Sequence, residues 1–443
     1  MKRWAQRIFG GLAVVALGLV TLYTVSRLRG PSAGQEAALA LMEQPMDTPG
    51  RNAFATLWLL DRDVPPARLE QIAELDIRRF ADSPLGSAPA GGFRSVAAAE
   101  YPALEVGHDE EPALCALRET GCLAQVRSDR AAYAGRIDAL RPLIRRAEGL
   151  SAYGHYRNRF APRMDRPLPQ VGNAMSAQRT AYSLAFVDGD VAGGLAGVCG
   201  MAETWRRFVP HSNSLIVSML AINTVTDAST LFAEMLAELP ADYPLPAECA
   251  TAFAPPRAGE GLVCEALKGE FDFTRRALQA NPHWRQHQPR GASRLFYDQR
   301  MTEARSASAF AQYCNEQARE RFAADAARQP AASSGLAGFD CLANSIGCLL
   351  ADVAAPAYVG YARRGQDHAA RRRLMATLLA LRKRSDDPRP LQARLDAQPP
   401  VLRSANRPIE PSDNGAALRI TLFDDSLGAD HWQVPLPPEL RDE

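Results

Sequence analysis

The sequence predicts an all-α fold of helical hairpins, packed as a bundle or an irregular solenoid, with one N-terminal transmembrane helix and a small C-terminal β-hairpin. Three observations carry this prediction. Apolar residues recur every three or four positions over most of the chain, one uncharged segment is long enough to cross a bilayer, and strand-like alternation is confined to residues 417–436. The formal net charge of the 443 residues is +1, so no basic excess indicates a partner nucleic acid.

The segment from Ile8 to Val25 predicts a transmembrane signal-anchor. Its eighteen positions carry no charge and would form a helix about 27 Å long, close to the thickness of a bilayer's hydrocarbon core. A slight excess of positive charge on the N-terminal side favours residues 1–7 in the cytoplasm. We favour an uncleaved anchor rather than a cleavable signal peptide, because the apolar region of a signal peptide is usually shorter. We interpret residues 26–50 as a linker.

Helical periodicity dominates residues 51–385, which we expect to form one or more helical domains with a possible boundary near 255–261. The predicted helices are Asn52–Leu60, Pro66–Phe80, Ala131–Leu150, Ala177–Val187, Val191–Val209, Ser214–Val225, Ala228–Leu239, Leu262–Ala280, Thr302–Ala327, Cys341–Tyr361 and His368–Arg384.

Two helical hairpins are expected within this region. In the first, Asp188-Gly189-Asp190 forms the turn, and Asp190 is placed to cap the second helix. Four glycines follow between Gly193 and Gly200; because no strand precedes them, we interpret them as a surface of close helix approach rather than a phosphate-binding loop. Residues 214–239 suggest a second hairpin.

A proline-rich link opens the last segment, residues 386–443. Beyond it, Ala417–Phe423 and His431–Leu436 alternate apolar and polar residues around a turn-forming stretch. This pattern predicts a short β-hairpin.

The eight cysteines all follow the predicted anchor, and their even number favours an oxidising compartment, here the periplasm. Four of them form two copies of the pattern C-x5-G-C-L, which places Cys115 before Cys122 and Cys341 before Cys348. Seven residues of continuous helix would separate each pair of Cα atoms by about 10.5 Å, whereas a disulfide needs roughly 7 Å or less. A local bond therefore requires the chain to bend between the two cysteines.

We predict the local disulfides Cys115–Cys122 and Cys341–Cys348, each formed across the end of a helix. Gly121 and Gly347 would supply the left-handed residue with which such a helix ends. The pairing of the remaining cysteines stays open; they are Cys199, Cys249, Cys264 and Cys314.

The sharpest candidate for a metal site is the pair His283 and His287, because histidines four residues apart share one face of a helix. The glutamate of the zincin helix is replaced here by Trp284, and a third ligand would have to come from a distant position. Candidates for that ligand are Glu265, Glu270, Asp272 and His155. We therefore expect no metal and no cofactor.

A basic stripe is predicted on the last long helix, formed by Arg371–Arg373 and Arg382–Arg384. We interpret it as a solvated helix face. The alternative is contact with anionic lipid or another envelope polymer.

The C-terminal part of the chain carries a resemblance. The stretch Asn344-Ser-Ile-Gly347, the Cys348-Leu-Leu that follows it and the arginine-rich helix ending in Leu381-Arg382 resemble a segment of uncharacterised, membrane-anchored helical proteins of proteobacteria. The similarity covers about residues 260–436, with Ser345 standing where the pattern has proline. It implies a helical fold and an envelope location, and no activity.

We favour a membrane-anchored periplasmic binding or scaffold protein without catalytic activity, held in the bacterial inner membrane by one pass and bound to a protein partner in the cell envelope. One alternative is an envelope hydrolase that uses a metal at His283 and His287 or a catalytic carboxylate such as Glu270. Another is an immunity-type protein that sequesters a toxin in the periplasm. Neither a Walker motif nor a G-x-S-x-G elbow supports an enzyme.

Overall fold

The computed structural model describes residues 2–84, 86, 92–104, 112–280, 295–329, 338–354, 358–424 and 428–441. Helix accounts for 62% of the structure and strand for 5%, which confirms a mostly helical protein with a small β element near the C-terminus. The chain forms two compact units. Unit 1 comprises residues 1–45, 271–317 and 329–359; unit 2 comprises residues 46–270, 318–328 and 360–443.

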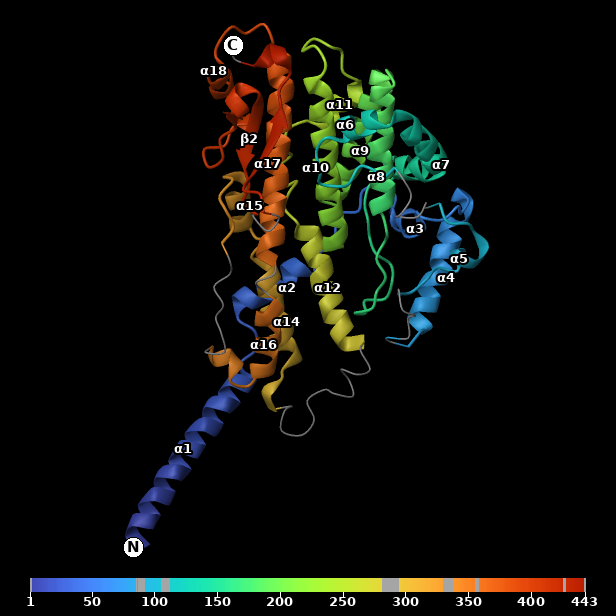
Figure 1. Ribbon diagram of the computed structural model, residues 1–443. Helices are drawn as coiled ribbons and strands as arrows, with labels where there is room; N and C mark the ends of the chain where they lie inside the picture. The colour runs from blue at the N-terminus through green and yellow to red at the C-terminus, as the bar shows by residue number, and fades with distance from the viewer. Residues whose placement is uncertain are drawn as a thin grey trace. The chain divides into compact units, whose positions relative to one another are not determined.

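Unit 1 is built around α14 (Gln299–Ala311), which packs against α2 (Ala33–Met42) and α16 (Ser345–Ala354). Its N-terminal helix α1 (Lys2–Leu28) extends away from these helices, with the N-terminus at its far end (Figure 1). This helix is long and apolar enough to span a membrane, and the residues of its apolar segment are exposed. Two other segments are also long and apolar enough to cross a membrane: Leu215–Ala237, which is mostly buried, and Ser345–Arg382.

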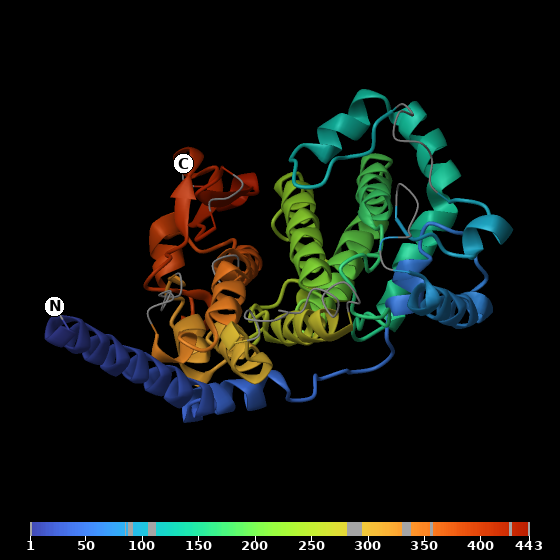
Figure 2. The same cartoon turned by 90° about the horizontal axis from the view of Figure 1, so that it is seen from below.

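Unit 2 has three central helices that lie side by side in Figures 1 and 2: α8 (Gly172–Val187), α9 (Val191–Phe208) and α10 (Leu215–Ala237). The helices α8 and α9 follow each other across residues 188–190 and pack against each other. Asp190 caps α9 by accepting a hydrogen bond from the Gly193 N–H at 3.0 Å. A Cβ atom on Gly194 would lie 2.9 Å from the carbonyl oxygen of Tyr182, so the glycines do mark a close helix approach.

The remaining helices of unit 2 lie outside this central group. They are α3 (Phe54–Trp58), α4 (Leu69–Asp82), α5 (Ala97–Glu100), α6 (Cys122–Ser128), α7 (Arg130–Glu148), α11 (Ala247–Ala252) and α18 (Leu391–Asp396). The division between units falls within three further helices: α12 (Cys264–Ala280), α15 (Glu316–Ala323) and α17 (Tyr358–Arg382). Residues 255–261 lie inside unit 2.

Three helix predictions are wrong. The predicted break between Tyr361 and His368 is absent, because α17 runs without interruption from Tyr358 to Arg382. Residues 214–239 form the single helix α10 rather than a hairpin, because no glycine or proline interrupts them and their polar residues are held by the rest of unit 2. Residues 302–327 instead form two helices, α14 and α15, because the chain turns at Gln312–Asn315.

The C-terminal strands form a three-stranded antiparallel sheet, where the sequence predicts two strands. Its order is β1 (Glu410–Ser412), β2 (Ala417–Thr421) and β3 (His431–Pro435), so β2 is central. The pair Leu418 and Val434 is buried on one face, which packs toward α10. This alternation of buried and exposed residues is what made β2 and β3 recognisable in the sequence.

The structure joins Cys115 to Cys122 and Cys341 to Cys348, the two local pairs that the spacing predicts, with Cα separations of 5.6 and 5.9 Å. It also joins Cys199 to Cys249, across 50 residues. Cys264 and Cys314 are disulfide-bonded as well.

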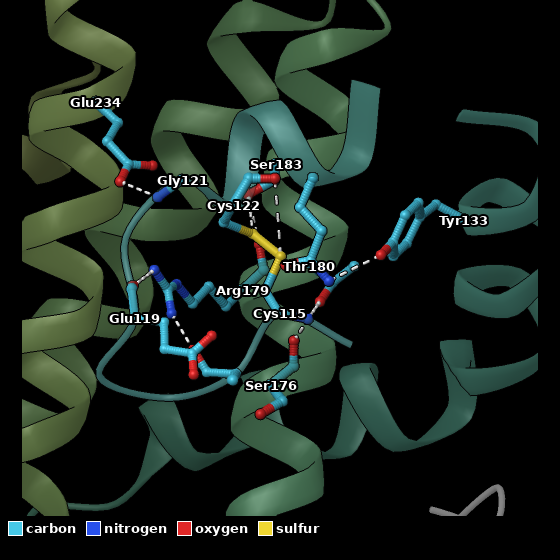
Figure 3. The surroundings of a disulfide bond; sticks show 12 residues. Cys115, Glu119, Gly121, Cys122, Tyr133, Ser176, Arg179, Thr180, Ser183 and Glu234 are labelled. Carbon is cyan, nitrogen blue, oxygen red and sulfur yellow. Dashed lines mark hydrogen bonds between the residues drawn. A yellow bond between two sulfur atoms is a disulfide. The ribbon is translucent and has the colours of Figure 1, made fainter. Parts of the chain in front are cut away.

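Gly121 is left-handed, with φ of +82°, but its predicted place at a helix end is wrong: it precedes α6 as the N-cap residue. Figure 3 shows how the loop between the two cysteines is held. The Gly121 N–H donates to Glu234 of α10 at 2.7 Å, and the guanidinium of Arg179 on α8 donates to the carbonyl oxygens of Ala116 and Glu119. The bend that the disulfide requires therefore lies in a loop ahead of a helix.

Gly347 does not adopt the predicted left-handed conformation, because it lies inside α16. The bend between Cys341 and Cys348 comes earlier, after the 3-10 turn Phe339–Cys341. A Cβ atom on Gly347 would overlap Thr302 Oγ1 and the side-chain amide of Asn344. Glycine is needed here so that α16 can approach α14.

We expect Gly347→Ala to destabilise the protein more than Gly121→Ala. The Gly347 substitution forces overpacking against Thr302, which costs about 1–3 kcal/mol. The Gly121 substitution meets no atom within 4 Å, so its cost is the backbone term of about 1 kcal/mol. Denaturant unfolding of the full chain measures both; an equal or larger loss for Gly121→Ala would contradict the steric explanation.

Candidate functional site

The structure disperses most of the residues that the sequence singled out as ligands or catalysts. His283 and His287 lie outside the described residues. His155 Nδ1 is 2.9 Å from the carbonyl oxygen of Pro49, and Glu265 pairs with Lys268 at 2.8 Å. Asp272 accepts a hydrogen bond from Arg276 at 2.7 Å.

Glu270, the candidate catalytic carboxylate, supports the start of a helix. Its Oε1 accepts a hydrogen bond from the Leu215 N–H at 3.1 Å, where α10 begins and backbone donors lack partners within the helix. Burial raises the pKa of Glu270, and the Leu215 N–H and Arg166 oppose this shift. This contact gives the Glu270 carboxylate a structural role that requires no catalysis.

Within the described residues, one group of potential metal ligands lies close together: Asp340, Cys341 and Cys348. The two sulfur atoms are bonded to each other, so neither is available as the thiolate that binds metal.

The basic stripe is solvated only in part: Lys383 and Arg384 are exposed, whereas three of its arginines are buried. Arg372 is only 1% exposed, Arg373 9% and Arg382 5%. Their partners come from other segments: Arg373 donates to Asp325 at 2.9 Å, Arg372 to the carbonyl oxygen of Ala254 at 2.7 Å, and Arg382 to that of Pro240 at 3.0 Å. A long side chain can reach such buried carbonyls while its stem packs on apolar neighbours.

Two of these arginines contact the walls of an apolar groove in unit 2, which has a volume of about 650 Å³. The groove lies between the segment 241–255, which contains α11, and the C-terminal part of α17. Its lining residues are Ala241, Asp242, Tyr243, Leu245, Pro246, Ala247, Ala250, Phe253, Ala254, Pro255, Ala376, Leu379, Ala380, Arg382, Lys383, Ser385 and Leu402. A cavity of this size, mostly apolar with a few polar groups, is typical of a ligand site.

The walls of the groove are fixed by long-range contacts. The Cys199–Cys249 disulfide ties α11 to α9, and Phe253 stacks on Phe232 of α10 with ring centroids 4.2 Å apart. The arginine contacts to Ala254 and Pro240 tie both ends of the segment to α17, at positions about 15 Å apart along the helix. The groove therefore lies between two points at which an arginine of α17 donates a hydrogen bond to a backbone carbonyl group.

The groove is electrostatically mixed. Lys383 and Asp242 are exposed at its rim, whereas Arg382 is buried in its wall. Burial lowers the pKa of Arg382, and the nearby carboxylates of Glu439 and Asp242 oppose this shift. Arg382 Nη1 has no hydrogen-bond partner.

A second, smaller hollow of about 200 Å³ has several charged or titratable residues in its lining, among them Glu203, His211 and Glu260. Glu260 is committed to a buried ion pair with Arg206, at 2.6 Å, and lies 3.4 Å from His368 Nε2. Burial alone would raise the pKa of Glu260, but His368 and Arg206 hold this pKa well below its usual range. Such a carboxylate is a poor general base near neutral pH, so we interpret this cluster as structural.

Comparison of the chain with models of known protein families, with curated proteins and with solved structures finds no match. The resemblance to membrane-anchored proteobacterial proteins stays a prediction.

Proposed function

We propose that the protein is a non-catalytic binding protein, anchored to the bacterial inner membrane by one pass of α1, whose groove holds a segment of a protein partner on the periplasmic side. The disulfides and the apolar N-terminal helix support this location. We infer a bundle rather than a solenoid for unit 2, because α6, α7, α9 and α10 all pack on α8.

The groove carries the proposal. Its apolar lining suits leucine-like side chains, and its rim offers both donors, from Lys383, and an acceptor, from Asp242. A polypeptide presents N–H donors, carbonyl acceptors and a terminal carboxylate, so it matches a rim of both signs. A fatty acid would satisfy the cations alone. The hydrolase alternative gains no support, because Glu270 and Glu260 both have structural partners.

We expect the full chain in phospholipid nanodiscs to bind a fluorescent, acetylated peptide of alternating leucine and alanine with a free C-terminal carboxylate. Ala250→Trp would fill the groove and weaken binding by at least about tenfold. Lys383→Glu would weaken it by about fivefold or less, since a rim charge contributes at most about 1 kcal/mol. Fluorescence anisotropy measures both changes.

The matched control is Ala397→Trp, which places the same bulk at an exposed position outside the groove lining and should leave binding unchanged. Equal affinity of Ala250→Trp and the unaltered chain would refute the groove as the site. Binding of a long-chain fatty acid without binding of any peptide would refute the polypeptide occupant.

A further inference from the structure

The outer face of α16 in unit 1 is an apolar stripe, although the opposite face of the helix is well packed. Gly347, Cys348 and Ala351 are buried. Within the helix the positions of the stripe are spaced as one helix face requires, and the exposed Leu342 precedes them in the bend before Ser345. The stripe consists of Leu342, Ile346, Leu349, Leu350 and Val353, four of them exposed by 47%, 53%, 38% and 74% in the order Leu342, Leu349, Leu350, Val353.

The stripe begins where the apolar run of α1 ends. Ser26 follows the last residue of that run; its hydroxyl donates to the carbonyl oxygen of Phe339 at 2.8 Å and accepts from the Ala343 N–H at 3.2 Å. Arg27 adds an ion pair with Asp298 at 3.4 Å. The other segments of unit 1 are therefore attached to α1 at the level where α1 would leave a bilayer.

A second apolar element contacts α1 slightly earlier, inside the run itself. The hydroxyl of Tyr23 donates to the carbonyl oxygen of Leu295 at 2.5 Å, and its ring meets that of Phe296 edge to face at 6.3 Å. Leu295 and Phe296 are 52% and 42% exposed. If α1 spans a bilayer as far as Val25, these side chains lie at the depth of the interface, where tyrosine is enriched.

We propose that the stripe on α16, together with Leu295 and Phe296, lies in the headgroup–acyl boundary of the bilayer that α1 crosses. Unit 1 is then held by an interfacial helix beside its transmembrane helix, with its apolar face about 5–10 Å deep. The bilayer is the occupant because the patch is continuous with the surface that α1 presents to lipid. This inference rests on the membrane anchoring in the proposed function and is independent of the groove.

The test uses the full chain, one copy per nanodisc of phosphatidylethanolamine and phosphatidylglycerol, with lipids that carry a spin-label quencher at the top of the acyl chain. A fluorophore is attached to a single introduced cysteine in each of three variants. Val353→Cys reports on the stripe, and Leu12→Cys reports on the insertion of α1. Gln317→Cys is the control; it is exposed and follows α14 in the chain, and the length of α14, about 20 Å, separates Asp298 from the end of that helix.

We expect strong quenching at position 353 and little at position 317. Position 12 should be quenched by lipids that carry the spin label deeper in the acyl chain. Adding Leu349→Glu and Leu350→Glu should reduce quenching at position 353, while the Cys341–Cys348 disulfide still forms. Quenching at position 353 no greater than at position 317, with position 12 quenched, would overturn the interfacial helix and leave the anchor intact. A blue-shifted but unquenched label at position 353 would also overturn it, by pointing to a protein cover such as a second copy. Absence of quenching at position 12 would remove the anchor itself.

Discussion

Arg407→Ala is expected to lower the free energy of unfolding by about 3–5 kcal/mol, because it removes the ion-pair partner of buried Asp367 and leaves buried Asp325 with Arg373 alone. Arg407 is 1% exposed. Its Nε lies 3.1 Å from both carboxylate oxygens of Asp325, its Nη1 lies 2.6 Å from Asp367, and its guanidinium stacks on Phe423 at 3.8 Å. One side chain thus joins the C-terminal link to α17 and to the segment after α15.

The loss should depend on pH. Although burial alone would raise it, Arg407 and Arg373 hold the pKa of Asp325 below its usual range. A lowered folded-state pKa contributes stability above the unfolded value of about 3.9, and this contribution is lost as the pH falls through the folded pKa. Burial raises the pKa of Asp367, so Asp367 acts in the opposite direction. Protonation of either carboxyl removes the unpaired charge that Arg407→Ala creates, so the difference between variant and unaltered chain should shrink in acid.

Arg419→Ala is the control, since Arg419 pairs with Glu410 at 3.0 Å while both side chains remain 48% exposed. That pair should contribute at most about 1 kcal/mol. Urea unfolding at neutral pH and near pH 4 decides the matter. An Arg407→Ala effect no larger than that of Arg419→Ala, or one that does not change with pH, would show that the network is not held by charge.

The sequence was sufficient to predict those elements whose conformation depends on residues a few positions apart. The α8–α9 turn was predictable because Gly189 and Asp190 specify it within a few residues. The single helix α10 was not, because the polar residue Asp227 suggests a break. Asp227 is buried and accepts a hydrogen bond from the Arg118 N–H at 2.6 Å, a partner 109 residues away that periodicity cannot reveal.

The candidate groove was missed for the same physical reason. Arg372 and Arg382 form a regular basic pattern, which is typical of a solvated helix face. Their partners are backbone carbonyl groups, and any residue type can supply those. The membrane segment and the cysteine pattern could be interpreted from the sequence because chain length, hydropathy and spacing limit them directly.

Removing the Cys199–Cys249 disulfide should destabilise the protein more than removing either local disulfide. In the chain-entropy treatment, a ring closed over a separation of 50 residues contributes about 4 kcal/mol, and one closed over a separation of 7 contributes about 2–3 kcal/mol. Both Cys199 and Cys249 are fully buried, so alanine at each leaves a small apolar gap and no unpaired polar group. The double variant Cys199→Ala with Cys249→Ala is therefore expected to lose about 4 kcal/mol.

The matched comparison is Cys115→Ala with Cys122→Ala, measured by denaturant unfolding under the same conditions. Because Cys249 lies on α11, loss of its bond to α9 should also loosen one wall of the groove and weaken peptide binding at temperatures where the variant is still folded. Cys115 and Cys122 hold a loop against α8 and α10 and line no part of the groove, so their removal should leave binding unchanged. A larger loss of stability on removing Cys115–Cys122 would contradict the expectation that the larger ring contributes more stability. An unchanged peptide affinity without Cys199–Cys249 would show that packing of Phe253 on Phe232 suffices to hold the wall in place.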